Sequence, residues 1–146
     1  MDIRFERRGG FRVFGYSIEL NISSHERDIA LLRDKYESKL IAISDRGLGL
    51  YFVTWLTKND NYIYHFGVDH QTQIHIDETA TCVEVPSGYY AVATVPKEMP
   101  ILEAWNELFE TALDAMGVVP NIEHGIYFEF FKENGVCEIW APLLKW

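Results

Sequence analysis

The order strand, helix, strand, strand occurs twice along this chain, and this repetition limits the possible folds more than any other feature. The first half has expected strands at 11–20, 47–57 and 62–68, with a helix over 24–40. The second half has expected strands at 81–86, 89–95 and in the hairpin 126–142, with a helix over 100–116. We predict one domain over residues 1–146 with an α+β fold. Duplicated β-α-β-β units, about 3–70 and about 80–145, would form an antiparallel sheet with two main helices and a ligand groove between the repeats.

Both expected helices have a start signal and an apolar stripe. Ser23 followed by Glu26 fits a capping box, and Pro100 suits the first position of the second helix. The second helix has the wider stripe, which ends before Gly117 and consists of Ile101, Leu102, Trp105, Leu108, Phe109, Ala112, Leu113 and Met116. A stripe this wide predicts a helix that packs against the sheet.

Two apolar runs joined at Asn134-Gly135 predict a β-hairpin over 126–142. Asn-Gly favours a two-residue type I′ turn, in which Glu133 would pair with Val136. Glu129 would then lie opposite Trp140. The side chains expected on this face of the sheet are Tyr127, Glu129, Phe131, Glu138 and Trp140.

The two halves can be aligned so that their strand-like runs coincide. The alignment that places Tyr16 on Tyr90 also places Trp55 on Glu129 and Phe66 on Trp140. If the two units lie side by side about an approximate two-fold axis, Trp55 would face Glu129 across the groove. The alternation of the 47–57 and 62–68 strands predicts one shared face for Tyr51, Val53, Trp55, Tyr64 and Phe66.

A carboxylate in the middle of an aromatic strand needs a partner, because burying an unpaired charge is costly. Glu129 could bond a neighbouring Tyr, Lys or Arg or face solvent; alternatively, a ligand cation could be its partner, with rings adding cation–π attraction. Any one ring is most simply a core residue, and the collection indicates a small-molecule site. The expected ligand-binding residues are Glu129, Tyr51, Trp55, Phe66, Tyr90, Trp105, Phe109, Phe131 and Trp140.

The charge balance, 13 Lys and Arg against 22 Asp and Glu, gives a net charge of −9 and disfavours direct nucleic-acid binding. No apolar run approaches a membrane span, and the start M-D-I-R-F-E-R-R lacks the apolar core of a signal peptide. We therefore expect a cytoplasmic protein with no membrane partner. Cys82 and Cys137 form no metal or redox motif and are expected to be reduced packing residues.

Three histidines with two aspartates resemble a metal-ligand set, but their five-residue spacing on strand and loop does not gather ligands. They are His65, His70 and His75, with Asp69 and Asp77. We expect no metal and no cofactor. Arg7-Arg8 is too short for an anion-binding patch and is expected to be a solvated terminus.

Four pieces of the second half carry a family resemblance. In order, they are V-P-S-G-Y-Y-A-V-A-T-V, I-L-E-A-W-N-E-L-F, Y-F-E-F-F and C-E-I-W-A-P-L, and the first half adds V-F-G-Y and H-F-G-V. Together they resemble the gyrase-inhibitor-like effector-binding domain found at the C-terminus of many AraC-type and multidrug-sensing bacterial activators. The resemblance implies two β-α-β-β repeats with a ligand groove and a sheet carboxylate, here Glu129, that pairs with cationic aromatic ligands. The family often carries Tyr two residues after this Glu, where this chain has Phe131, which lacks the hydroxyl. With no room for a helix-turn-helix region, a stand-alone effector domain is expected.

Three functions remain open at this point. The first is non-enzymatic binding of hydrophobic cations, either as a sensor for a separate DNA-binding regulator or as a sequestering protein. The second is a gyrase-inhibitor-like interaction with gyrase, which the acidic surface would suit. The third is hydrolysis of reactive cyclopropane-bearing compounds, as in some relatives with this fold, using Glu129 as general acid or base.

Overall fold

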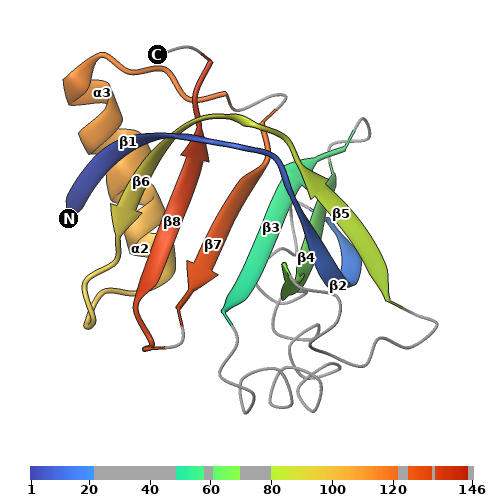
Figure 1. The fold of residues 1–146 in the computed structure, drawn as a ribbon. Helices are drawn as coiled ribbons and strands as arrows, with labels where there is room; N and C mark the ends of the chain where they lie inside the picture. The colour runs from blue at the N-terminus through green and yellow to red at the C-terminus, as the bar shows by residue number, and fades with distance from the viewer. Residues whose placement is uncertain (22–48, 58–60, 70–79, 122–124, 133, 145–146) are drawn as a thin grey trace.

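The computed structural model describes residues 1–21, 49–57, 61–69, 80–121, 125–132 and 134–144 (Figure 1). Its strands form one antiparallel sheet in the order β1-β6-β8-β7-β3-β4-β2-β5. The strands are β1 (Asp2–Arg8), β2 (Phe11–Asn21), β3 (Leu50–Leu56), β4 (Asn61–Val68), β5 (Thr81–Val85), β6 (Gly88–Thr94), β7 (Tyr127–Phe131) and β8 (Cys137–Pro142). The predicted α+β fold with an antiparallel sheet is confirmed. The helix expected over 24–40 lies outside the described residues.

The sheet order shows the duplication directly. If each strand is replaced by its counterpart in the other half (β1 by β5, β2 by β6, β3 by β7, β4 by β8, and the reverse), the same strand order results, read from the opposite edge of the sheet. In the structure, the hairpin pair Val53–His65 is equivalent to the pair Phe128–Trp140. This structural alignment places Thr54 on Glu129, so the predicted alignment, which places Trp55 there, is wrong by one position.

The error of one position comes from the turns. The Thr57 N–H donates to the Asn61 carbonyl at 2.7 Å, and the Lys132 N–H donates to the Val136 carbonyl at 2.8 Å. Each hairpin therefore has three residues between its last paired positions, whereas the prediction for 126–142 used a two-residue turn. Gly135, at φ 85°, takes the left-handed conformation that closes a three-residue turn.

A turn that is longer by one residue changes which side chains of the two strands share a face, because side chains alternate between the faces with a period of two. Glu129 lies opposite Ile139, and Trp140 lies opposite Phe128. The prediction that Glu129 and Trp140 share a face is wrong.

The same reversal occurs in the first half. Tyr64 and Phe66 pair with Thr54 and Phe52, so they share a face with these two residues and not with Trp55. The prediction that one face holds Tyr51, Val53, Trp55, Tyr64 and Phe66 is therefore wrong.

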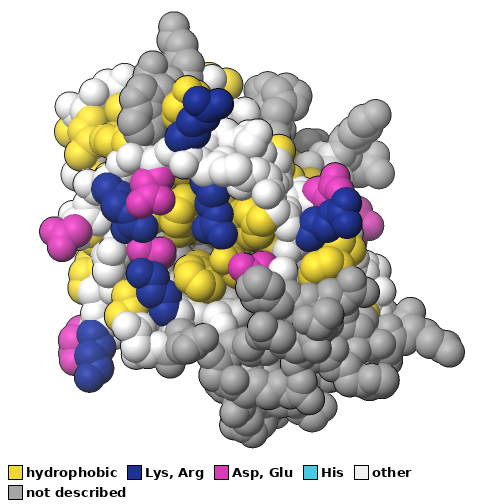
Figure 2. Space-filling model, viewed as in Figure 1, with side chains coloured by type: hydrophobic (Ala, Val, Ile, Leu, Met, Phe, Trp, Pro, Cys, Tyr) yellow, Lys and Arg dark blue, Asp and Glu magenta, His cyan; other side chains and the backbone are white. Residues whose placement is uncertain are grey.

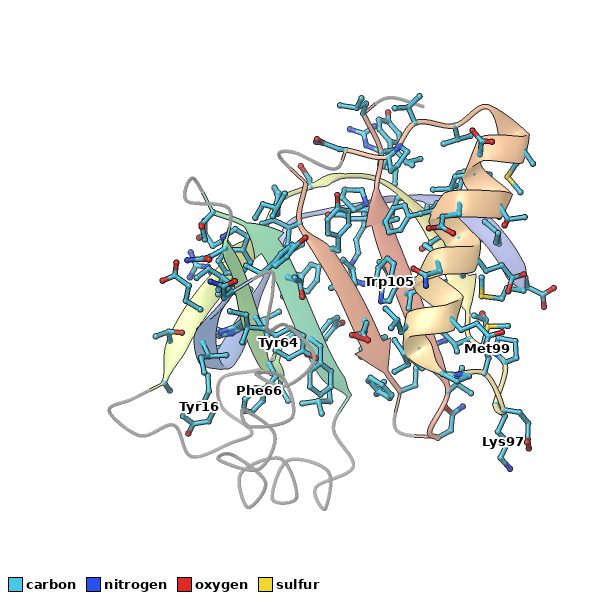
Figure 3. All side chains as sticks on the ribbon, turned by 180° about the vertical axis from the view of Figure 1, so that it is seen from behind. Tyr16, Tyr64, Phe66, Lys97, Met99 and Trp105 are labelled. Atoms are coloured by element: carbon cyan, nitrogen blue, oxygen red, sulfur yellow. The ribbon has the colours of Figure 1, made fainter. Side chains whose placement is uncertain are left out.

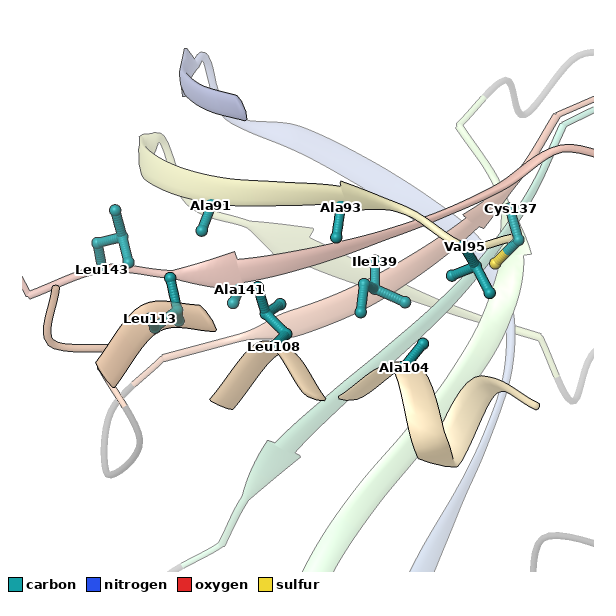
Figure 4. Packing of buried hydrophobic residues seen from close by; sticks show 10 residues of the cluster. All are labelled: Ala91, Ala93, Val95, Ala104, Leu108, Leu113, Cys137, Ile139, Ala141 and Leu143. Carbon is teal, nitrogen blue, oxygen red and sulfur yellow. The ribbon is translucent and has the colours of Figure 1, made fainter. Parts of the chain in front are cut away.

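One helix covers one face of the sheet in the described part of the chain (Figure 1). It runs continuously through α2 (Ile101–Asn106), the π-helical η3 (Glu107–Ala112) and α3 (Leu113–Met116). Figure 4 shows Ala104, Leu108 and Leu113 pointing from the helix toward β6 and β8. Leu108 and Leu113 are five positions apart, and the π-helical turn places both side chains in the core.

The opposite face forms a second core inside the curl of the sheet. Only two residues separate β1 from β2, yet these strands lie near opposite edges, so the sheet must bend back on itself. The short β5–β6 connection likewise joins strands near opposite edges, starting from the other edge of the sheet (Figure 1). The enclosed side chains include Val13, Val53, Val85, Val92 and Phe128, each at most 1% exposed.

β1 was not expected as a strand. It pairs with β6 from Asp2–Thr94 to Arg8–Gly88. Ile3 and Phe5 alternate with charged residues, a pattern typical of an edge strand. Arg7 and Arg8 were predicted to be a solvated terminus. Both lie in this strand; Arg7 is exposed, but Arg8 is half-buried, so the prediction is wrong for Arg8.

Candidate functional site

Glu129 lies in β7, at the centre of the sheet, on the face that the helix covers. It is 9% exposed. Its neighbour across β3 is Phe52, and Tyr127 and Phe131 share its face along β7. The carboxylate is therefore surrounded by rings on its own strand and on the next one.

The helix supplies a second layer of aromatic surface. Trp105 and Phe109, one turn apart, stack with ring centres 5.6 Å apart and planes at 12°. Tyr127 presents an edge-on contact to both, at 6.1 Å to Trp105 and 5.8 Å to Phe109. All three rings are half-buried, so they keep some surface that a ligand could contact.

The first half of the chain contributes rings from the other side of Glu129. Phe52 meets Phe131 edge-on at 5.5 Å and lies 5.8 Å from Tyr64 and 6.2 Å from Phe66. Figure 3 shows this face, with Trp105 on the helix and Tyr16, Tyr64 and Phe66 on the strands of the first half. Both halves therefore bring aromatic side chains to the face that carries Glu129.

Two other ionisable groups on this face stay neutral at physiological pH. Burial, and then the charges of Glu129 and Glu138, raise the pKa of the Cys137 thiol to about 12. Burial and the nearby Tyr62 raise the pKa of Tyr127 to about 12, and its hydroxyl donates to the Asn121 carbonyl at 2.8 Å. Neither group adds a negative charge beside Glu129.

The nine predicted ligand-binding residues divide between the two faces of the sheet. Those on the helix-covered face are Glu129, Phe66, Phe131, Trp105 and Phe109. Those on the enclosed face are Tyr51, Trp55, Tyr90 and Trp140. The prediction that Trp55 faces Glu129 is wrong, because the residue opposite Glu129 in β3 is Phe52. The three-residue turns are the physical reason for both differences.

The rings on the enclosed face do surround a cation, but it belongs to the chain itself. The Arg8 guanidinium lies 4.0 Å from the ring centre of Phe11, 4.9 Å from Trp140, 5.4 Å from Phe128 and 5.6 Å from Tyr51. It also donates to the Tyr51 hydroxyl at 2.9 Å. Cation–π attraction therefore holds β1 against this core, and Arg8 occupies the space beside two of the predicted ligand-binding rings, Tyr51 and Trp140.

Glu138, the second carboxylate of the hairpin, belongs to an ion cluster on that same face. Arg4 lies 2.8 Å and Lys132 lies 3.4 Å from its Oε2, and the Trp140 indole donates to its Oε1 at 3.4 Å. Burial raises the pKa of Glu138, but Arg4 and Lys132 outweigh burial and lower it overall. Figure 2 shows this face, where basic and acidic side chains lie together over hydrophobic surface.

The predicted ligand-binding set omitted Tyr127 in β7, Phe52 and Thr54 in β3, and Tyr62 and Tyr64 in β4, which all lie on the face of Glu129. Phe52 and Thr54 alternate with Tyr51, Val53 and Trp55 along one strand. Because bulky side chains occur in both alternate sets, composition could not show which set faces Glu129.

His65, considered above as a metal ligand, is fully buried on the enclosed face. Its Nε2 lies 2.9 Å from the Val13 carbonyl, and its Nδ1 bonds the Ser17 hydroxyl. Both ring nitrogens are therefore occupied within the core. His70, His75 and Asp77 lie outside the described residues.

We expect the free energy of unfolding to fall as the pH drops from 6.5 toward 4, because of His65. Burial lowers its pKa to about 4 although the bond to Val13 raises it, so the unfolded chain takes up this proton first. The slope should be about 1.4 kcal/mol per pH unit in that window. Urea unfolding at pH 6.5, 5.5 and 4.5 measures it, and His65→Gln should flatten the slope. Equal slopes in both proteins would contradict this assignment.

Comparison with known proteins gives one family and several similar folds. The model of the family Cass2, integron-associated effector binding protein, matches residues 4–143. The structure of SAV2435 bound to tetraphenylphosphonium has a TM-score of 0.75 at 15% identity, covering 98% of this chain and 94% of that one. An integron cassette protein of Vibrio cholerae has a TM-score of 0.73 at 18% identity, covering 97% and 95%. A hydrolase from Listeria innocua has a TM-score of 0.54 at 8% identity, covering 97% and 90%.

Identities this low establish a shared fold and nothing more specific. No curated protein matches the chain. In the described part of the chain, no helix has both the length and the apolar character needed to cross a bilayer.

Proposed function

Because the chain belongs to the integron-associated effector-binding proteins, a gyrase-inhibitor-like family, we propose that it binds hydrophobic aromatic cations on the helix-covered face of its sheet. The observation that carries the proposal is the position of Glu129. Its carboxylate is 9% exposed and lies between rings of the helix, β7 and the first half of the chain. SAV2435, a relative in fold, is bound to tetraphenylphosphonium, a cation of this class.

The site residues in this proposal are Glu129 for charge and the rings of the same face for apolar contact. The rings are Phe52, Phe66, Trp105, Phe109, Tyr127 and Phe131. Burial of ligand surface at about 25 cal/mol per Å² would supply most of the affinity. The carboxylate would select for positive charge, because an anion brought to the same place meets a like charge in a medium of low dielectric constant.

Hydrolysis through a cysteine nucleophile is disfavoured by the state of the thiol near Glu129, so a hydrolytic route would need Glu129 itself to activate a water molecule. Cys137 lies on this face and carries a thiol, whose pKa is raised in part by the charge of Glu129. This pKa of about 12 keeps Cys137 a thiol at neutral pH. A thiol is a poor nucleophile compared with a thiolate. We therefore propose a binding protein that acts either as a sensor for a separate DNA-binding regulator or by sequestering the ligand.

We expect the protein to bind tetraphenylphosphonium with a roughly micromolar Kd, about −8 kcal/mol, and tetraphenylborate at least tenfold more weakly. The two ions have the same shape and opposite charge, so their difference isolates charge selection. Isothermal titration calorimetry measures both. The titrations are repeated at 0.5 M NaCl, which screens the net charge of −9 but screens a buried carboxylate much less. Equal affinities at high salt would refute the proposed selection.

A further inference from the structure

We infer that the site accepts one positive charge per ligand and that Thr54 is the residue that sets this limit. The inference rests on the proposed function and deepens it. It starts from the symmetry of the sheet: Val53 and Phe128 hold equivalent positions in the two halves and also pair with each other. The approximate two-fold axis that relates the halves therefore passes through this pair.

The residues flanking the axis on the helix-covered face come in two matched pairs. Phe52 lies opposite Glu129, and Thr54 lies opposite Tyr127. The structural alignment of the halves places Phe52 on Tyr127, a ring on a ring. It also places Thr54 on Glu129, so the symmetry-related position of the carboxylate holds a neutral hydroxyl.

Thr54 is placed to contact the same ligand as Glu129. The two residues are diagonal neighbours on adjacent strands, and such positions are about 7–8 Å apart. Thr54 is half-buried and therefore keeps some exposed surface. A flat aromatic ligand lying across β7 and β3 would cover both positions.

The charge limit follows from the cost of removing a charge from water. A monocation placed beside Glu129 exchanges hydration for a carboxylate. A second positive charge on the same ligand would lie beside Thr54, whose hydroxyl dipole compensates the lost hydration only in part. The asymmetry between Glu129 and Thr54 therefore selects monocations over dications of equal shape.

The test compares two probes that differ by one charge. They are 1-methyl-4-phenylpyridinium, a monocation, and 1,1′-dimethyl-4,4′-bipyridinium, a flat dication of nearly the same shape. We expect the parent protein to bind the monocation at least fivefold more tightly at 0.5 M NaCl. Thr54→Glu should move the ratio of the two Kd values at least tenfold toward the dication. Thr54→Gln, which adds the same bulk without charge, should leave the ratio within twofold of the parent.

Each result decides the question. A Thr54→Glu protein that gains equally for both probes, or a Thr54→Gln protein that shifts the ratio as much, overturns the inference. If tetraphenylphosphonium binding depends on Glu129 while the ratio does not respond to residue 54, the inference fails and the proposed function stands. If the parent binds none of these cations, the proposed function fails, and the inference fails with it. Thermal melting checks folding, and Thr54→Asp provides a second acidic variant if Thr54→Glu does not fold.

Discussion

Glu129→Gln is expected to weaken tetraphenylphosphonium binding by about 100-fold. Gln has nearly the same shape as Glu, so the substitution removes the charge and keeps the packing. Two unit charges about 5 Å apart attract by ~3 kcal/mol at an effective dielectric constant of about 20, and 1.4 kcal/mol corresponds to tenfold in Kd. Calorimetry on parent and variant measures the change, and the preference over tetraphenylborate should shrink by a similar factor.

Glu138→Gln is the matched control for this experiment. It removes the same charge from the same hairpin, but Glu138 lies on the enclosed face, bonded to Arg4 and Lys132. Its effect on the Kd should stay within about twofold, although the protein should lose some stability because Arg4 and Lys132 lose their ion pair. A Glu129→Gln protein that binds as tightly as the parent, or a Glu138→Gln protein that loses as much affinity, would show that Glu129 is not the charge-selecting group.

Gly67→Ala is expected to lower the free energy of unfolding by more than about 3 kcal/mol, or to prevent folding. Gly15 and Gly67 pair directly across β2 and β4. A Cβ added to Gly67 would lie 2.0 Å from the Phe14 carbonyl oxygen, and one added to Gly15 would lie 1.8 Å from the Phe66 carbonyl oxygen. These contacts are with backbone atoms, which cannot move aside without breaking the strand pairing. The close approach explains the glycines of V-F-G-Y and H-F-G-V, two pieces of the family resemblance.

Gly88→Ala is the control for the glycine experiment. Gly88 begins the strand β6, and a Cβ built there has no heavy atom within 4 Å. The free energy of unfolding should change by less than about 1 kcal/mol, with a small gain expected from the reduced entropy of the unfolded chain. Urea unfolding measures all three proteins. A Gly67→Ala protein as stable as Gly88→Ala would contradict the close strand approach.

Much of the fold could be predicted because its signals are local. The wide apolar stripe after Pro100 located the helix at 101–116, and the aromatic runs located β2, β3, β4, β6, β7 and β8 within a few positions. β1 was missed because its alternation consists of only Ile3 and Phe5 among charged residues, and its pairing partner, β6, lies in the second half of the chain. The burial of Arg8 depends on that pairing and on the curl of the sheet, neither of which is a local property.

The site could be predicted only in part. Glu129, Phe66, Phe131, Trp105 and Phe109 do share the helix-covered face, whereas Trp140, Trp55, Tyr51 and Tyr90 form the enclosed core. Along β7, the residues Tyr127 to Phe131 place rings on both faces, so either register would bury a similar amount of apolar surface. Hydrophobic burial therefore gave no basis for choosing between a two-residue and a three-residue turn.

By itself, the sequence determined the helix after Pro100, the strands β2 to β8, the duplication and the family, because these depend on residue types along short segments and on their repetition. Only the tertiary structure decided which rings surround Glu129, that Arg8 fills the aromatic cage of the other face, and that Thr54 stands where a second carboxylate would stand. One additional residue in each turn moves every side chain of one strand to the opposite face of the sheet relative to its partner strand. The packing of the whole sheet selects this turn length.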